Sequence, residues 1–223
     1  MIPNKPPATQ PLPDGLQAVI FDLGGVITTG LAEAMNEVLS RHKSVSPAWL
    51  ERVHSRWSPL YLQASLGQIT PDELWRQLLL GEDSGSLFAE QAEEEFLSAI
   101  RLREPDIAQT LTALQSKYKL GLLSNHVGRW ARELLGRFGL LPFFPAVVIS
   151  SDIGARKPHP LAYQRICGMM HIAPEQAAYI ADEEEDLVGC QAVGMFPIFI
   201  AGQDASSSVG LVIERLSDLR GLF

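Results

Sequence analysis

Short apolar runs alternate with helical patterns along much of the chain. Runs of four mostly hydrophobic residues occupy positions 18–21, 120–123, 146–149, 177–180 and 197–200. They show no polar alternation, which is typical of strands that are buried on both faces of a parallel sheet. From residue 107 onward, stretches with helical spacing separate these runs. Strands that alternate with helices predict an α/β fold with a doubly wound, mostly parallel sheet.

Residues 30–103 show a different pattern, in which hydrophobic residues recur at helical spacing. Ser46-Pro47 and Thr70-Pro71 have the residue types that begin helices, and Ser58-Pro59 suggests that a helix restarts there. No stretch of this segment has a convincing strand pattern. We therefore predict a small helical bundle inserted after the first strand, with its aromatic residues in the bundle core rather than in a ligand site.

The two patterns divide the chain. We expect an α/β core formed by residues 16–29 and 104–223, and a helical insert formed by residues 30–103. Residues 1–15 are rich in proline and have no apolar core, so we expect a loose N-terminal arm. Residues 212–219 are expected to form one more short helix.

Polar side chains follow the first four apolar runs: Asp22, Ser124, Ser150-Ser151 and Asp182. Right-handed crossovers place the carboxyl ends of parallel strands at one edge of the sheet, and open α/β sheets bind their ligands at that edge. Gly24-Gly25 follows the first of these polar residues and allows the backbone to turn sharply beside a bound group. The pattern therefore predicts a single site built from several strand ends.

The acidic residues of this edge indicate a cation site. Asp22 and Asp182 both follow strands, and Asp186 would share a helix face with Asp182 if a helix began there. Several carboxylates do not sit together without neutralisation. A hard divalent cation with oxygen ligands neutralises them, and Mg²⁺ is suited to a site where the substrate supplies a phosphate. Residues 183–185 are glutamates that we interpret as a solvated first helical turn.

Three further residues have the chemistry to bind a phosphoryl group. Ser124 and Asn125 supply neutral donors at a strand end. Lys157 precedes a proline, which favours an extended backbone, and its cation would offset the carboxylates and stabilise charge on a transferring phosphoryl group. A surface location is the ordinary alternative for any single lysine.

Composition narrows the class of protein. The 223 residues carry a formal net charge of −8, and no basic stripe is present, so nucleic acid is not an expected partner. The two cysteines, Cys167 and Cys190, do not form a disulfide framework, and no apolar run is long enough to span a bilayer. We expect a globular cytoplasmic protein that does not bind membranes; the sequence leaves its oligomeric state open.

Taken together, the motifs resemble those of the haloacid dehalogenase-like hydrolase superfamily, across nearly the whole chain. The matching stretches are residues 20–26 (the nucleophile motif), 123–125 (the second motif), 157–160 (the third motif) and 181–182 with Asp186 (the acidic fourth motif). Their order and spacing also agree. The helical segment from about Leu31 to Arg103 is similar to the cap that these enzymes insert after the first motif. The resemblance implies a Rossmann-like core with an α-helical cap.

The resemblance also implies a nucleophile and a metal site. Asp22 would attack phosphorus and form an aspartyl-phosphate. The side chains of Asp22 and Asp182 and the backbone carbonyl of Gly24 would bind Mg²⁺. Asp186 would support the metal or its waters.

The remaining roles concern the substrate. By resemblance, Ser124, Asn125 and Lys157 would hold the phosphoryl oxygens, and Lys157 would also act in catalysis; whether Lys157 or the adjacent Arg156 contacts phosphate rests on the resemblance alone. The cap would close over the substrate and exclude water. The implied activity is that of a Mg²⁺-dependent phosphatase acting on a small phosphorylated metabolite.

One position departs from the usual motif of these phosphatases. Gly24 stands where they carry a second Asp that protonates the leaving group and activates water. General acid-base help contributes roughly 10²- to 10⁴-fold in rate. A water, His126 or a cap residue could take that role, although a structural histidine is the more ordinary interpretation. Two alternatives therefore stay open: a metal-free hydrolase of the dehalogenase branch, and a degenerate member that binds a phosphorylated ligand without turnover.

Overall fold

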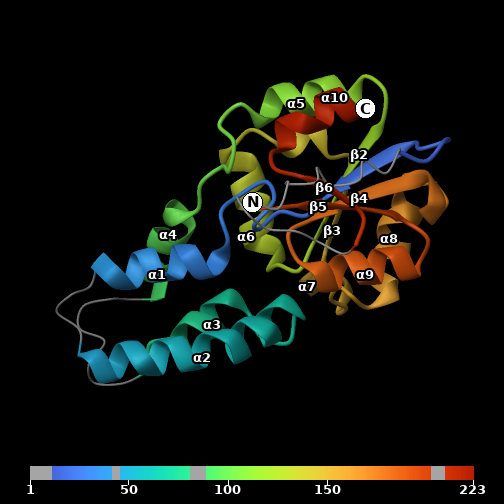
Figure 1. The fold of residues 1–223 in the computed structure, drawn as a ribbon. Coiled ribbons are helices and arrows are strands. Elements are labelled where there is room, and N and C mark those ends of the chain that lie inside the picture. The colour runs from blue at the N-terminus through green and yellow to red at the C-terminus, as the bar shows by residue number, and fades with distance from the viewer. Residues whose placement is uncertain (1–11, 42–45, 81–88, 202–208) are drawn as a thin grey trace, which may run out of the picture.

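The computed structural model describes residues 12–41, 46–80, 89–201 and 209–223. Within them, the chain forms one six-stranded sheet whose strands are all parallel (Figure 1). The strand order is β3-β2-β1-β4-β5-β6. The strands are β1 (Ala18–Phe21), β2 (Lys119–Ser124), β3 (Ala146–Ile149), β4 (Ala177–Ala181), β5 (Phe196–Ile200) and β6 (Leu211–Ile213). The predicted α/β class and parallel sheet are confirmed.

The five apolar runs are the first five strands of this sheet. β1 lies in the centre, and each of its residues is fully buried. It pairs with β2 on one side and β4 on the other, so three of the predicted strand ends meet around Asp22. Continuous burial explains why these strands are uniformly apolar, because both of their faces are covered.

Helices cover both faces of the sheet. On one face, α8 (Pro160–Met170) packs on β2 and β3, and α9 (Glu184–Ala192) packs on β4 and β5. On the other face lie α5 (Ile107–Gln115), α6 (Gly128–Arg137) and α10 (Leu219–Leu222) (Figure 1). The remaining short helices are α7 (Ser150–Ile153) and the 3₁₀ turns at Leu141–Phe143, Pro174–Gln176 and Leu216–Asp218.

Four helices lie between β1 and α5 in the chain: α1 (Leu31–Arg41), α2 (Pro47–Ser65), α3 (Pro71–Leu78) and α4 (Ala89–Ala99). We call them the helical segment; they lie together beside the sheet (Figure 1). The two predicted helix starts are as expected, because Ser46 and Thr70 accept hydrogen bonds from the backbone N–H groups of Trp49 and Glu73. Pro59 does not restart a helix, since α2 continues through it.

Aromatic side chains join the helical segment to the core. Trp57 and Trp75 contact Phe96 with ring centroids 5.3 and 5.5 Å apart, and Phe96 contacts Trp130 of α6 at 5.3 Å. These side chains are buried, as the sequence pattern predicts for most of the aromatics. Buried aromatic pairs add packing energy beyond their area, so this cluster fixes the helical segment against α6.

The C-terminal prediction is wrong in part. Residues 211–213 form β6, an edge strand paired with β5, and only the residues after it are helical. Buried Glu104 accepts hydrogen bonds from the backbone N–H groups of Leu216 and Ser217, which begins the helical turn there. The strand has three residues, too few for its pattern to be distinguished from a helix in the sequence. Residues 1–11 of the predicted N-terminal arm lie outside the described residues.

Candidate active site

Asp22 lies directly after β1 and is 7% exposed. Its backbone N–H donates to the carbonyl of Ile180 over 3.0 Å, which continues the pairing of β1 with β4 by one residue. Its Oδ1 accepts a hydrogen bond of 2.7 Å from the N–H of Leu23. These contacts fix one carboxylate oxygen and leave Oδ2 directed to other partners.

Lys157 is the main partner of that second oxygen. Its Nζ lies 2.5 Å from Oδ2 of Asp22, 2.7 Å from Oδ2 of Asp186 and 2.5 Å from the hydroxyl of Tyr179. The lysine side chain is fully buried. Burial alone would lower its pKa, but the two carboxylates raise the pKa of Lys157 above its usual value. The ammonium therefore stays charged and holds the two aspartates in place.

Asn125 positions Lys157. Its side-chain amide donates to the carbonyl of Lys157 over 3.0 Å and accepts from the N–H of Lys157 over 2.8 Å. The backbone carbonyl of Asn125 accepts a hydrogen bond of 2.6 Å from the hydroxyl of Tyr61 in α2. Both groups of the amide are thus engaged by the backbone, whereas the sequence suggested a direct contact with phosphate.

Asp182 follows β4 and lies against the turn after Asp22. A Cβ atom on Gly25 would fall 1.8 Å from Oδ2 of Asp182, and Gly25 has φ of +75°. Only glycine fits there, because the space is occupied and the backbone is left-handed. Burial, and then the negative charge of Asp22, raise the pKa of Asp182 to about 6.

Asp186 lies in the first turn of α9 and is 3% exposed. The helix begins at Glu184, so Asp182 precedes it. The prediction that Asp182 and Asp186 share one helix face is therefore wrong. Burial raises the pKa of Asp186 in spite of the nearby ammonium of Lys157. The two aspartates still line one cavity, because the strand end and the helix start adjoin.

That cavity has a volume of about 280 Å³. The strand ends contribute Asp22, Gly24, Ser124, Asn125 and Asp182 to its lining, and the first turn of α9 contributes Asp186. Trp57 and Tyr61 of α2 line the side formed by the helical segment, and their rings stack with centroids 5.5 Å apart. Sequence reasoning assigned such aromatics to a bundle core and gave Arg156, which also lines the cavity, only a passing role. The spacing of Trp57 and Tyr61 does not distinguish them from core aromatics, since their position over the site depends on how α2 docks.

Ser150-Ser151 were expected at the site, but neither residue lines the cavity. Ser150 is buried; its hydroxyl accepts from the N–H of His126 over 3.0 Å and donates to the carbonyl of Ser65 over 2.6 Å. The pair begins α7 and joins the loop after β2 to the end of α2. This is a correction: the third strand end supports the site without facing it.

His126 is fully buried at the edge of the cavity. Its Nδ1 lies 2.9 Å from the backbone nitrogen and 3.1 Å from the backbone carbonyl oxygen of Val127, and no polar atom of the described residues pairs with its Nε2. Burial lowers the pKa of His126 to about 4. A histidine that is neutral at pH 7 is a poor general acid, which favours a structural role.

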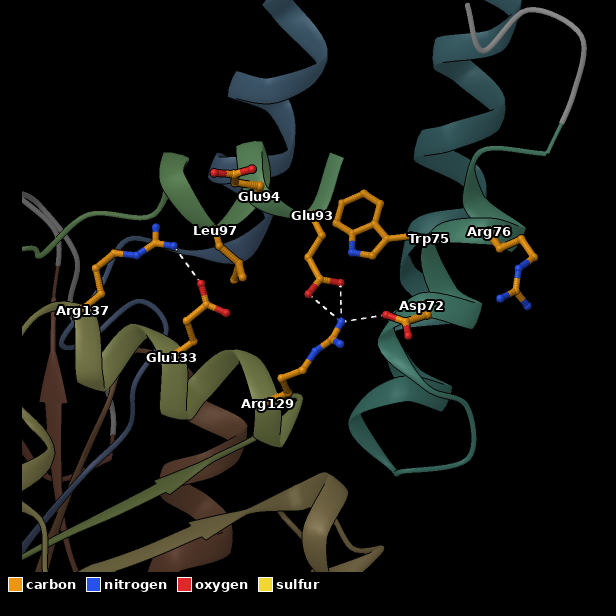
Figure 2. A pocket seen from close by; sticks show the side chains of 9 residues that line it. All are labelled: Asp72, Trp75, Arg76, Glu93, Glu94, Leu97, Arg129, Glu133 and Arg137. Atoms are coloured by element: carbon orange, nitrogen blue, oxygen red, sulfur yellow. Dashed lines mark hydrogen bonds and ion pairs between the residues drawn. The ribbon is translucent and has the colours of Figure 1, made fainter. Parts of the chain in front are cut away.

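A larger hollow of about 610 Å³ lies between the helical segment and α6 (Figure 2). Arg129 of α6 points into it and pairs with Asp72 of α3 at 2.9 Å and Glu93 of α4 at 2.6 Å. Glu133 and Arg137 pair with each other on the same wall at 2.8 Å. The ion pairs of Arg129 join α6 to the helical segment, and the lining shows no nucleophile beside a base, so we assign the chemistry to the smaller cavity.

Within the described part of the chain, no group of three or more His, Cys, Asp or Glu side chains is arranged to hold a metal ion. Among helices of the described ranges, none is both long enough and apolar enough to cross a membrane.

The chain is similar in sequence to known phosphatases. The chain is 33% identical over 122 residues to phosphoglycolate phosphatase of Escherichia coli strain K12. The match covers 52% of this chain and 48% of that protein, so the chain spans about half the length of this curated relative.

Solved structures share the fold. The structure of a phosphatase from Thermococcus onnurineus matches with a TM-score of 0.69 at 24% identity, covering 93% of this chain and 97% of that one. L-2-haloacid dehalogenase from Xanthobacter autotrophicus matches with a TM-score of 0.70 at 19% identity, covering 93% and 98%. At these identities the likeness concerns the fold alone. A family model described as haloacid dehalogenase-like hydrolase matches residues 16–194, which is most of the chain, and the chain therefore belongs to the haloacid dehalogenase-like hydrolase family.

Proposed function

We propose that this protein is a Mg²⁺-dependent phosphatase of small phosphate monoesters, with Asp22 as the nucleophile. The observation that carries the proposal is the strand-end cluster, in which Asp22 is held by Lys157 and lies near Asp182 at a cavity of about 280 Å³. The partial match to a phosphoglycolate phosphatase supports the same class of substrate.

The donor set fits a hard cation. Burial, and then the negative charge of Asp22, raise the pKa of Asp182 to about 6, and a divalent cation held by these carboxylates would stabilise their charged forms. Mg²⁺ needs only one or two protein carboxylates, because waters and substrate phosphate complete its octahedron. We propose that Asp22, Asp182 and the carbonyl of Gly24 hold it, with Asp186 supporting. When bound, it would neutralise phosphoryl charge and allow an anionic nucleophile to approach.

In the proposed reaction each of these side chains has a separate role. Asp22 Oδ would attack phosphorus and form an O–P bond while the bond to the leaving oxygen breaks; the leaving oxygen takes a proton from water. A second water would then cleave the aspartyl-phosphate at phosphorus, releasing phosphate and restoring the carboxylate. We propose that Ser124 and Lys157 hold phosphoryl oxygens, and that Asn125 contributes by fixing Lys157.

The helical segment completes the site in this proposal. Residues 30–103 act as a cap on a core of residues 16–29 and 104–223. Tyr61 connects the two, because its hydroxyl donates to Asn125 while its ring lines the cavity. Docking of α2 thereby excludes water around the nucleophile, which strengthens the electrostatic interactions of the site.

Metal binding gives the first test. In calorimetric titration with MgCl₂, the wild type is expected to bind Mg²⁺, and Asp182→Asn to bind at least about tenfold more weakly, because a ligand charge is lost. Asp152→Asn is the matched control, since Asp152 pairs with Arg132 outside the cavity. If the wild type shows no measurable affinity for Mg²⁺, the metal-dependent phosphatase is wrong and the metal-free dehalogenase alternative gains support.

The open space at Gly24 gives a second test. A Cβ added to Gly24 meets no atom within 4 Å, and Gly24 lies on the cavity. Gly24→Asp is therefore expected to fold and, by supplying an acid and base near the leaving group, to raise kcat by roughly tenfold or more, within the 10²- to 10⁴-fold range of such groups. Steady-state kinetics on an aryl phosphate and an alkyl phosphate measure the effect.

Gly24→Asn is the matched control, because asparagine has nearly the same size and transfers no proton at neutral pH. An increase in both variants would show that the side chain acts by filling space. Equal or lower turnover in Gly24→Asp would show that a water already performs the proton transfers.

A further inference from the structure

Arg156 lines the same cavity as the proposed nucleophile, Asp22. It directly precedes Lys157 in the chain, yet the two cations face different surroundings. Lys157 is fully buried and bonded to two aspartates, whereas Arg156 is partly buried and lines the cavity. The backbone that Asn125 fixes therefore presents one cation to the carboxylate of Asp22 and the next to the cavity.

The contacts of Arg156 leave most of its donors unused. Nη1 donates to the hydroxyl of Ser65, and the guanidinium carbon lies 5.8 Å from the ring centroid of Tyr61. Within the described ranges of the chain, no carboxylate lies within 4 Å of it, while other arginines near the helical segment, such as Arg129, pair with acids. A guanidinium has five N–H donors in a planar fork, so one hydrogen bond to a serine leaves a face free for a carboxylate.

Arg156 is a cation in a cavity that several acidic side chains also line. Four carboxylates line it: Asp22, Asp182, Glu183 and Asp186. Among the described residues of that lining, Arg156 is the only lysine or arginine. Lys157 offsets the charges of Asp22 and Asp186, but an anionic substrate group remote from the phosphate would still be repelled by the remaining acids unless it lay against the Arg156 guanidinium. The stacked rings of Trp57 and Tyr61 line the same cavity, whose volume of about 280 Å³ suits a small substrate.

We propose that Arg156 determines specificity by binding a carboxylate on the leaving group, so that the favoured substrates are short phosphorylated hydroxy acids. The assignment rests on the proposed phosphatase function and narrows its substrate class. Arginine suits this task because its fork binds both oxygens of a carboxylate, which fixes the orientation of the leaving group.

The test compares two phosphate monoesters of similar size, of which only one carries a carboxylate. The wild type is expected to hydrolyse 2-phosphoglycolate with a higher kcat/KM than 2-hydroxyethyl phosphate, in which a hydroxymethyl group replaces the carboxylate. Arg156→Gln is expected to lower kcat/KM for 2-phosphoglycolate by about 10- to 100-fold, the range of a charged hydrogen bond. Its activity on 2-hydroxyethyl phosphate should change by less than about threefold.

Two controls separate binding from structure. Arg132→Gln removes the same charge from a residue that pairs with Asp152 outside the cavity, and should leave both rates unchanged. Ser65→Ala removes the hydroxyl that Arg156 contacts but keeps the guanidinium, so the preference for the acid should persist. A parallel loss of both substrates in Arg156→Gln would overturn the proposal, because it would show contact with the phosphoryl group or a structural role; so would an unchanged preference.

Failure of the proposed function has a different signature. If the wild type hydrolyses neither substrate, the phosphatase assignment fails, and Arg156 is judged by calorimetric binding of 2-phosphoglycolate and 2-hydroxyethyl phosphate. Weaker binding of the acid alone in Arg156→Gln supports the carboxylate contact. Equal affinities of wild type and variant for the acid overturn it.

Discussion

Replacing Asp22 by asparagine is expected to reduce phosphate release by at least about 10⁴-fold, because an amide oxygen does not act as the nucleophile. Asparagine keeps the size of the side chain and still accepts the hydrogen bond from Leu23 that fixes Oδ1. The fold should therefore persist, and at Mg²⁺ concentrations that saturate the variant the loss should appear in kcat. Initial rates on an aryl phosphate, with circular dichroism of both proteins, measure it.

Asp152→Asn again provides the comparison, as an exposed aspartate whose partner lies outside the cavity. It should retain the wild-type rate. Phosphate release by Asp22→Asn at a rate within tenfold of the wild type would show that another group attacks phosphorus, or that water attacks directly. In that case the position of Asp22 beside Lys157 would have only a structural meaning.

Lys157→Met is expected to produce the largest loss of stability. The ammonium lies within 2.7 Å of two buried aspartates, and removing it leaves both carboxylates without their cation. Breaking a buried ion pair by removing one partner costs about 3–5 kcal/mol of unfolding free energy. Chemical denaturation measures this loss directly. Phosphate release should also fall below detection, because Asp22 loses the contact that orients it.

Lys117→Met is the matched control for the lysine. Lys117 is exposed and its ammonium donates to the backbone carbonyl of Phe223, so its replacement should change stability by less than about 0.5 kcal/mol. A Lys157→Met protein as stable as this control would show that the aspartates do not depend on the ammonium. They would then be neutralised by protonation instead.

The sequence was most informative about the sheet. Asp22, Ser124 and Asp182 come at the ends of continuous apolar runs. Such runs are typical of buried parallel strands, so the three residues could be placed at one edge of the sheet. The surroundings of the third strand end could not be predicted in this way. Ser150 begins the short helix α7, and its hydroxyl donates a hydrogen bond to the carbonyl of Ser65. No pattern in the residues around Ser150 indicates either feature.

Residues that depend on docking could not be predicted in the same way. Tyr61 and Trp57 have the spacing of a helix core, and they reach the cavity only because α2 lies against the loop of Asn125. Arg156 faces the cavity while its neighbour Lys157 is buried, a difference set by loop geometry. Side-chain direction in loops depends on tertiary contacts rather than on periodicity.

The most direct test of the central claim is the initial rate of phosphate release by the wild-type protein, measured with Mg²⁺ and with excess chelator. Chloride release from 2-chloropropionate is followed in parallel. We expect phosphate release that requires Mg²⁺, and no chloride release. Chloride release that persists in chelator, with no hydrolysis of any phosphate monoester, would contradict it and assign Asp22 to attack on carbon.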